Sequence, residues 1–227
     1  MSDGPASSSL ARLSIVLPIG PGDRAWPPLH ATLRERAPEA ELLPVFATGD
    51  PQTAPAAALR CAPGRARQQN AGAEAATRDW LWFVHADTRL TPEALPALGT
   101  FLARDEPALG WFRLRFAEEG PRGLRLRMRC NAVGANWRSR ALGLPFGDQG
   151  LVLPRAAFAR LGGFDTTLAC GEDHALVWAA RRAGLPLRAI DAALITSPRK
   201  YAERGWATTT LRHLRLTAAQ AWREARR

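Results

Sequence analysis

The stretch Trp80-Leu-Trp-Phe-Val-His-Ala-Asp-Thr88 joins a continuous apolar run to a polar end. The run from Trp80 to Val84 suits a strand that is buried on both faces, and it is far shorter than the roughly 18–20 residues that span a bilayer. No transmembrane helix is therefore expected. In open parallel sheets, ligands bind at the carboxyl ends of the strands, so His85 and Asp87 are the first candidate site residues.

The residues before this strand alternate between strand and helix patterns. The apolar run Leu13–Ile19 predicts a first strand that is covered on both faces, and Glu41–Ala47 reads as a second strand. Helical spacing predicts helices over Pro28–Ala37 and Arg65–Thr77, while the Pro- and Ala-rich stretch Thr48–Pro63 reads as a loop with a short helical turn. Strands and helices of these lengths predict βαβ units and a parallel sheet.

The second half of the chain gives more mixed signals. Residues Trp111–Phe116 alternate between aromatic or aliphatic side chains and arginines, which predicts a half-exposed, antiparallel strand. A basic amphipathic helix is expected over Gly123–Leu142, interrupted at Gly134. The other expected elements are a strand at Leu151–Leu153 and helices at 92–103, 156–161, 172–183 and 207–227.

Length and composition favour one globular domain. The chain has 227 residues, 46% of them hydrophobic and 23% charged. We expect a flexible tail over residues 1–10 and a single domain over 11–227, with a nucleotide-binding half near 11–105 and an acceptor-binding half near 106–227. Three widely spaced cysteines and the lack of a signal-peptide pattern favour a reducing cytoplasm.

The net charge of +10 raises the question of a phosphate-bearing partner. Lys200 is the only lysine among the 31 basic residues, and the arginines are scattered at helical spacings rather than gathered in a block. A solvated helix face explains that pattern as well as a nucleic-acid site does. Nucleic acid is therefore not the expected partner, whereas phosphate in a nucleotide or an anionic lipid remains a candidate.

Two acidic positions each have a structural and a chemical interpretation. Asp87 could bind a metal ion at the sheet edge, or it could cap the helix that follows; His85 is either a hydrogen-bonded spacer or a metal ligand. Glu172 and Asp173 open a helix, where they could cap its amides. The helix dipole would also favour the ionised carboxylate, which prepares Asp173 to act as a base.

Seven motifs in chain order resemble the family 2 glycosyltransferases of GT-A fold. They are the Ser14-Ile-Val-Leu-Pro18 strand, Gly64-Arg-Ala-x-Gln-x-Asn70-Ala-Gly-Ala73, Phe83-Val-His-Ala-Asp87-Thr, Gly147-Asp-Gln-Gly150, Leu161-Gly-Gly-Phe164, Glu172-Asp173 and Thr196-Ser-x-Arg-Lys-Tyr201. More narrowly, they resemble a small bacterial subfamily that carries His-Ala-Asp-Thr in place of the usual Asp-x-Asp. The resemblance spans about residues 13–210 and implies a three-layer α/β/α sandwich with a mostly parallel central sheet.

The resemblance also implies roles for individual residues. Asp87 matches the acid that ligates a divalent metal, Mn²⁺ or Mg²⁺, on the donor diphosphate, with His85 as a further candidate ligand. Asp173 matches the general base that deprotonates the acceptor hydroxyl in an inverting transfer. Donor binding falls to Pro18, Arg65, Asn70, Asp87, Arg199 and Lys200, and the sugar or acceptor to Asp148, Gln149 and Glu172.

The sequence departs from the family pattern in two places. The Asn-Glu expected after the first strand is replaced around Gly20-Pro-Gly-Asp23, and the acid expected at the end of the second strand is replaced by Phe46-Ala-Thr-Gly-Asp50. Asp23 or Asp50 is a candidate substitute from a shifted loop. If neither substitutes, recognition of the nucleotide base is altered.

The sequence therefore predicts a metal-dependent, inverting transferase that moves a sugar from a nucleoside-diphosphate sugar to a hydroxyl acceptor. Two alternatives remain: a lapsed GT-A domain that binds RNA or an anionic membrane, and a nucleotidyltransferase on a similar sheet. The carboxy-terminal helix carries an apolar stripe at Leu211, Leu214, Ala218 and Trp222, flanked by arginines that include Arg226. We expect that stripe to pack on the core; the other reading is peripheral contact with the inner face of the membrane and a lipid-linked acceptor.

Overall fold

The computed structural model describes residues 9–224, except for the side chains of Lys200, Arg204, His213, Gln220 and Arg223. The predicted tail and Arg226 thus fall largely outside the described residues. Leu10, which the sequence placed in that tail, is instead buried in the core beside Leu13. No helix within the described part is long and apolar enough to cross a bilayer.

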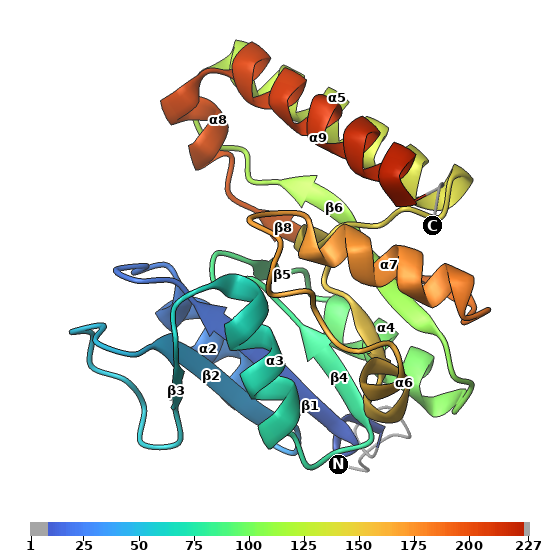
Figure 1. Ribbon diagram of the computed structural model, residues 1–227. Helices are drawn as coiled ribbons and strands as arrows, with labels where there is room; N and C mark the ends of the chain where they lie inside the picture. Colours follow the sequence, from blue (N-terminus) through green and yellow to red (C-terminus); the bar gives the residue numbers. More distant parts are fainter. Residues whose placement is uncertain (1–8, 225–227) are drawn as a thin grey trace.

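A single mixed sheet organises the molecule (Figure 1). Its strand order is β3-β2-β1-β4-β7-β6-β8-β5. The strands are β1 (Leu13–Ile19), β2 (Glu41–Ala47), β3 (Leu59–Cys61), β4 (Trp80–Phe83), β5 (Arg89–Leu90), β6 (Leu109–Phe116), β7 (Val152–Pro154) and β8 (Leu187–Thr196).

The first four strands of that order are parallel, as the alternation of strand and helix predicts. The predicted bounds of β1 and β2 are confirmed. The prediction of an irregular loop over Thr48–Pro63 is wrong in part, because β3 forms there and pairs with β2. A strand at β6 is confirmed; it is antiparallel to β7 but parallel to β8, with which it pairs along its whole length.

Helices cover both faces of the sheet. The core on one face gathers β1 side chains with α2 (Trp26–Arg36) and α4 (Ala94–Ala103). The core on the other gathers alternate β1 and β2 side chains with α3 (Arg65–Ala75), α6 (Arg155–Arg160) and α7 (Glu172–Arg182). The result is the predicted three-layer α/β/α sandwich.

Two long helices lie beyond the sandwich. Figure 1 shows α5 (Arg122–Ala141) beside α9 (Trp206–Glu224), above the sheet. The short helix α8 (Arg199–Arg204) connects the end of β8 to α9. The predicted interruption of α5 at Gly134 is wrong: the helix is continuous, and this glycine faces open space. The expected core packing of the α9 stripe is also wrong, because Leu211, Leu214 and Trp222 are exposed.

Candidate active site

Polar residues gather where the parallel strands end at their carboxyl side. His85–Asp87 follow β4 directly, and the 3-10 turn η1 (Gly147–Gln149) precedes β7. Because β7 runs antiparallel to β4, with Trp82 opposite Val152, the turn and the His85–Asp87 segment lie at the same edge of the sheet. This edge is where open α/β sheets bind ligands.

Asp173 joins this edge through its contact with η1. It is the second residue of α7, and its side chain is only 9% exposed. A Cβ atom placed on Gly147 would lie under 3.0 Å from the Asp173 carboxylate. Only a glycine therefore lets the turn approach the carboxylate this closely. The topology thus brings the loop that carries Asp87 and the start of α7 to one edge, although 86 positions separate Asp87 from Asp173 in the chain.

Arg65, the first residue of α3, holds both acids of α7. Its Nε donates to Glu172 Oε1, and its Nη2 lies 3.2 Å from Asp173 Oδ2. The N-cap residue of α7 is Gly171, which has no side chain to cap the helix, so the capping role of the two acids stays a prediction. The two carboxylates face α3 across the site.

Burial sets the proton affinity of Asp173. Loss of water, together with the charges of Glu172 and Asp148, raises the pKa of Asp173 to about 6, although Arg65 acts in the opposite direction. The sequence led us to expect a helix dipole that favours the ionised form. Burial has the larger effect, and the pKa of Asp173 is raised rather than lowered. A carboxylate with this pKa is ionised at neutral pH and can still accept a proton.

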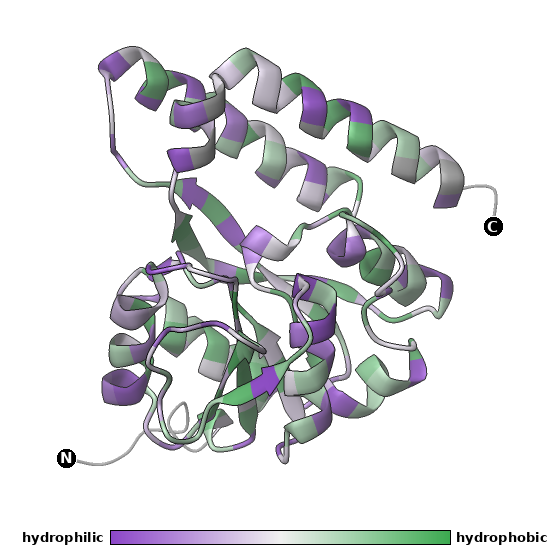
Figure 2. Cartoon of the chain, turned by 60° about the vertical axis from the view of Figure 1, so that its left-hand side comes forward, coloured by the Kyte–Doolittle hydropathy of each residue, from purple (hydrophilic) through white to green (hydrophobic). Residues whose placement is uncertain are grey.

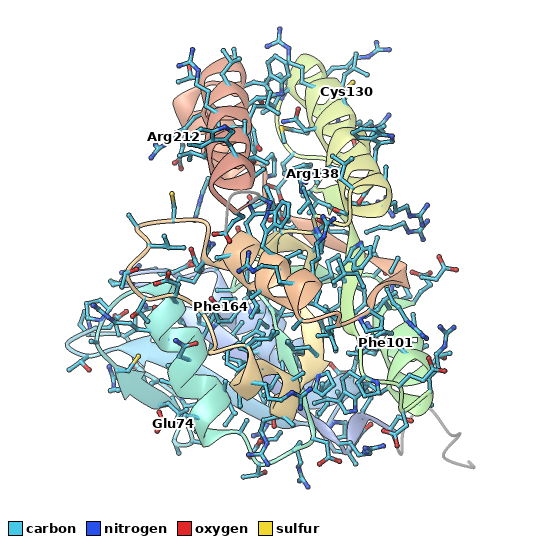
Figure 3. The ribbon with its side chains drawn as sticks, turned by 45° about the vertical axis from the view of Figure 1, so that its right-hand side comes forward. Glu74, Phe101, Cys130, Arg138, Phe164 and Arg212 are labelled. Carbon is cyan, nitrogen blue, oxygen red and sulfur yellow. The ribbon has the colours of Figure 1, made fainter. Side chains whose placement is uncertain are left out.

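Asp148 lies among both cations and acids of the site. The negative charge of Asp148 raises the pKa of Arg65 and of Asp173. It also raises the pKa of Arg138 and of Tyr201, but burial affects these two more, because it lowers the pKa of Arg138 and raises that of Tyr201. Arg138 extends from α5 (Figure 3). Its guanidinium stacks over the Phe146 ring at 3.6 Å from the centroid. Sequence reasoning missed Arg138, because one arginine among six in an amphipathic helix gives no signal of its own.

Gln149 and Asn70 serve the architecture around the site. Gln149 is fully buried, where it accepts from Ser139 and from the Phe146 amide and donates to the Phe112 carbonyl. Asn70 exchanges two hydrogen bonds with the backbone of Phe164, and so ties α3 to the loop after α6. The side chains of Gln149 and Asn70, which were predicted to contact the acceptor or sugar and the donor, thus form hydrogen bonds within the protein.

The remaining predicted donor residues are spread more widely. Pro18 is buried within β1 opposite Val45, and Arg199 is exposed at the start of α8, where its amide donates to Ser197 Oγ. The side chain of Lys200 lies outside the described part. Asp87 is half-buried. The helix that follows, α4, begins only at Ala94, and its N-cap residue makes no side-chain cap in the described part of the chain. The helix-capping interpretation of Asp87 is therefore wrong.

Asp50 occupies the place where the sequence departs from the family pattern. Its carboxylate accepts from the Gln52 amide, the Gln52 side chain and the Gly22 amide, so it joins the loop after β2 to the loop after β1. These hydrogen bonds, led by that of the Gln52 amide, lower the pKa of Asp50. Asp50 thus stands beside the altered loop, while Asp23, within that loop, accepts a hydrogen bond from the Ala25 amide at 3.0 Å.

A pocket of about 420 Å³ reaches the acid cluster of Asp148, Glu172 and Asp173 at Glu172, the member of the cluster that lines it. It opens between the start of α3, at Arg65 and Arg67, and the loop that precedes α7, at Leu168, Cys170 and Glu172. One wall is therefore cationic and the other carries a carboxylate. The pocket offers a polar substrate access to the pair formed by Arg65 and Glu172.

Comparison with known proteins bears on the family and the fold. Residues 59–162, just under half of the chain, match the profile of Glycosyl transferase family 2. The matched segment contains α3, β4, the His85–Asp87 loop and η1, while Asp173 lies beyond it. No curated protein matches the chain.

Solved structures share the fold. A mannosyltransferase from Pyrobaculum calidifontis in complex with GDP-Man and Mn²⁺ is 18% identical, with a TM-score of 0.63 over 93% of this chain and 64% of its own. TarS 1-349 from S. aureus in complex with UDP-GlcNAc is 13% identical, with a TM-score of 0.59 over 82% and 58%. This chain thus spans less than two thirds of each. It has a GT-A-type α/β fold, and its residues 59–162 are similar to Glycosyl transferase family 2.

Proposed function

We propose that this protein transfers a sugar, with inversion, from a nucleoside-diphosphate sugar to a hydroxyl acceptor. The observation that carries the proposal is the buried Asp173 carboxylate, which is held by Arg65 and has a pKa of about 6 at the ligand-binding edge of the sheet. The nucleotide sugars bound by the two structural neighbours agree with such a donor.

Asp173 acts as the base in one displacement. Its Oδ1 atom is buried and has no hydrogen-bond partner among the described residues, while Oδ2 faces Arg65. Oδ1 takes the proton of the acceptor hydroxyl as the hydroxyl oxygen bonds to the anomeric carbon. The bond from that carbon to the diphosphate oxygen breaks on the opposite side, and the nucleoside diphosphate leaves with the electron pair.

Positive side chains stabilise the charges around this step. Arg65 stays protonated because Asp173, Glu172 and Asp148 together raise its pKa, although burial alone would lower it. It orients Asp173 and pairs with Glu172 beside the pocket, where Glu172 and Asp148 can bind sugar or acceptor hydroxyls. Arg199 and Lys200, on α8, are the proposed cations for the diphosphate.

We assign a divalent ion to Asp87 as a site that the protein and the donor phosphates share. The described residues contain no group of three or more His, Cys, Asp or Glu that could hold a metal alone. Mg²⁺ commonly binds through one or two carboxylates together with substrate phosphates and water, so Asp87, with His85 beside it, suffices for such a site. When bound, the ion neutralises charge on the departing diphosphate.

Product analysis tests the proposal. Donor turnover is measured with Mn²⁺, with Mg²⁺ and with a chelator, for the wild type, Asp87→Ala and Asp173→Asn. We expect nucleoside diphosphate as the product, a loss of rate with the chelator and with Asp87→Ala, and a loss of roughly 10²–10⁴-fold with Asp173→Asn. Pyrophosphate release would identify a nucleotidyltransferase instead, and wild-type rates in both variants would refute the assigned roles.

A further inference from the structure

Helix α5 exposes an apolar stripe that the sandwich leaves uncovered. Leu126, Val133 and Trp137 are 62%, 69% and 62% exposed. With Cys130 they follow one another at intervals of four, three and four residues, which places them on one face of the helix. The opposite face is buried at Met128, Ala132 and Ser139. The outer stripe of α5 therefore consists of Leu126, Cys130, Val133 and Trp137.

Helix α9 exposes a second stripe. Leu211, Leu214 and Trp222 are 54%, 61% and 58% exposed, and Ala218 lies between them on the same face. The helix is held to the molecule through other positions, at the buried Thr209 and at Glu224, which accepts from Arg182 at 2.7 Å. The outer stripe of α9 therefore consists of Leu211, Leu214, Ala218 and Trp222.

The two helices lie side by side. Asn131 Nδ2 donates to Thr210 Oγ1 at 3.2 Å, and the Arg127 guanidinium lies 5.3 Å from the centroid of the Trp206 ring. Both contacts use residues outside the two stripes, and the apolar side chains of the stripes remain largely exposed. Figure 2 shows hydrophobic and hydrophilic residues alternating along both helices at the far end of the molecule. We call this surface the α5/α9 face.

Arginines flank the apolar residues, and acids are scarce. The acidic residues nearest the face are engaged: Glu118 pairs with Arg129 at 2.9 Å, and Glu224 is buried with Arg182. Helix α5 contains no Asp or Glu, and Glu224 is the only acid of α9. The exposed arginines of the face are Arg122, Arg127, Arg129, Arg140, Arg212 and Arg215.

We propose that the α5/α9 face docks on an anionic lipid bilayer. Exposed Leu and Trp in line along a helix, with arginines beside them, are the features of helices that lie in the membrane interface. A second copy of the chain would bring two positive faces together. RNA would engage the arginines but would leave the leucines and valine in water. An anionic bilayer complements both the charge and the apolar side chains.

Docking there would bring the active site to the lipid surface. Trp137 belongs to the stripe, and the next residue, Arg138, reaches the Phe146 ring and the neighbourhood of Asp148. Tyr201 of α8, one helix before α9, also responds to the charge of Asp148. If the proposed transferase activity holds, the acceptor is lipid-linked, with its polar end at the acid cluster.

Vesicle cosedimentation tests the docking. The full chain is mixed with phosphatidylcholine vesicles, with or without about one third phosphatidylglycerol, at low and at moderate salt. We expect binding to the anionic vesicles that weakens as salt rises. Each arginine near an anionic surface contributes roughly fivefold in affinity, so Arg212→Glu/Arg215→Glu should reduce binding at least about 25-fold. Trp137→Ser/Leu214→Ser should reduce it at least about tenfold.

Matched variants separate docking from general charge and from catalysis. Arg104→Glu/Arg160→Glu makes the same change in net charge at two exposed positions, one just after α4 and one at the end of α6, and should bind like the wild type. Asp173→Asn should also bind like the wild type, so the vesicle result stands even if the transferase assignment fails. All variants change exposed side chains except Asp173→Asn, and circular dichroism verifies their folding.

Several results would overturn the proposal. One is absence of vesicle binding by the wild type at low salt; another is an equal loss in the Arg104/Arg160 variant. A third is a wild-type dimer, without vesicle binding, that Trp137→Ser/Leu214→Ser converts to a monomer, which would assign the face to self-association. Binding to single-stranded RNA without binding to vesicles would assign it to nucleic acid.

Discussion

The Nη2 atom of Arg65 lies 3.2 Å from Oδ2 of Asp173, although 108 positions separate the two residues in the sequence. Arg65 opens one helix and Asp173 opens another, on either side of the ligand-binding edge. The pair keeps a buried acid ionisable in a place where burial alone would favour its neutral form. The proton-accepting capacity of the site therefore depends on a residue that does not itself accept a proton.

The pKa of Asp173 predicts the acid limb of the activity profile. Because its pKa is about 6, kcat/KM should be level near pH 7–8 and should fall towards tenfold per pH unit well below pH 6. The measurement is kcat/KM against pH with metal and donor held constant. A profile that stays level down to pH 4.5 would show that Asp173 is not the base.

The same pKa predicts that Asp173→Asn stabilises the fold at neutral pH. An acid whose pKa is raised from 3.8 to about 6 binds its proton more tightly in the folded state, so it lowers stability as pH rises through that window. The variant should unfold with a free energy higher by on the order of 1–3 kcal/mol at pH 7.5, and by little at pH 3.5. Denaturant titration at both values measures this, with the exposed Asp191→Asn as the control.

Arg65 should be replaceable only in part by lysine. Arg65→Met leaves Glu172 and Asp173 buried without a cation, so the acid limb should move to higher pH and stability should fall by about 1–3 kcal/mol. That is less than for a fully buried pair, because the guanidinium is 39% exposed. Arg65→Lys keeps the charge but cannot reach both acids as the Nε and Nη2 atoms do, so an intermediate profile is expected. Identical profiles in all three proteins would contradict this role.

Gly147→Ala should reduce kcat without unfolding the protein. The φ angle of this glycine suits other residues, and the obstacle is the Asp173 carboxylate, which would lie under 3.0 Å from the new Cβ. The carboxylate must therefore move, and a displacement of this kind costs activity on the order of 10²-fold. Gly134→Ala is the control, because its Cβ meets open space within a helix. Equal rates in the two variants would show that Asp173 tolerates the shift.

Gly72→Ala should affect stability rather than chemistry. A Cβ on this α3 residue would lie under 3.0 Å from Val16 Cγ1 of β1. Overpacking of this kind costs typically 1–3 kcal/mol, and Val16→Ala in the same chain should restore part of that loss by making room. Thermal unfolding of the single and double variants measures both. Additive losses would mean that the two side chains do not compete for one space.

The elements that the sequence predicts well are those with a strong local pattern. The strands β1 and β2 are continuous apolar runs, and their bounds follow from the sequence alone. By contrast, β3 consists of Leu59, Arg60 and Cys61 after an irregular stretch, and no element was expected at the Ala-containing β8. Both are defined by their partners: β3 by β2, and β8 by its pairing along β6.

The site shows a similar division. Asp87, Glu172 and Asp173 stand out as acids at the start of loops or helices, and the topology places them at one edge. The pKa of Asp173 depends on burial and on Arg65 from a distant helix, which local spacing does not report. The exposure of the α9 stripe likewise depends on how a whole helix is docked, because an amphipathic pattern looks the same whether its apolar side meets a core or remains open.

The sheet has one narrow seam. Its parallel half joins the rest through β7, and β7 meets β6 through a single residue pair, Gly110 with Val152. Arg65 belongs to the part before this seam, and Asp173 to the part after it, so their ion pair fastens the two parts together. The apolar cores on both faces also cross this seam, because each gathers side chains from strands on either side of it. The ion pair therefore adds a charged link at the ligand-binding edge to the apolar contacts that already join the two parts of the sheet.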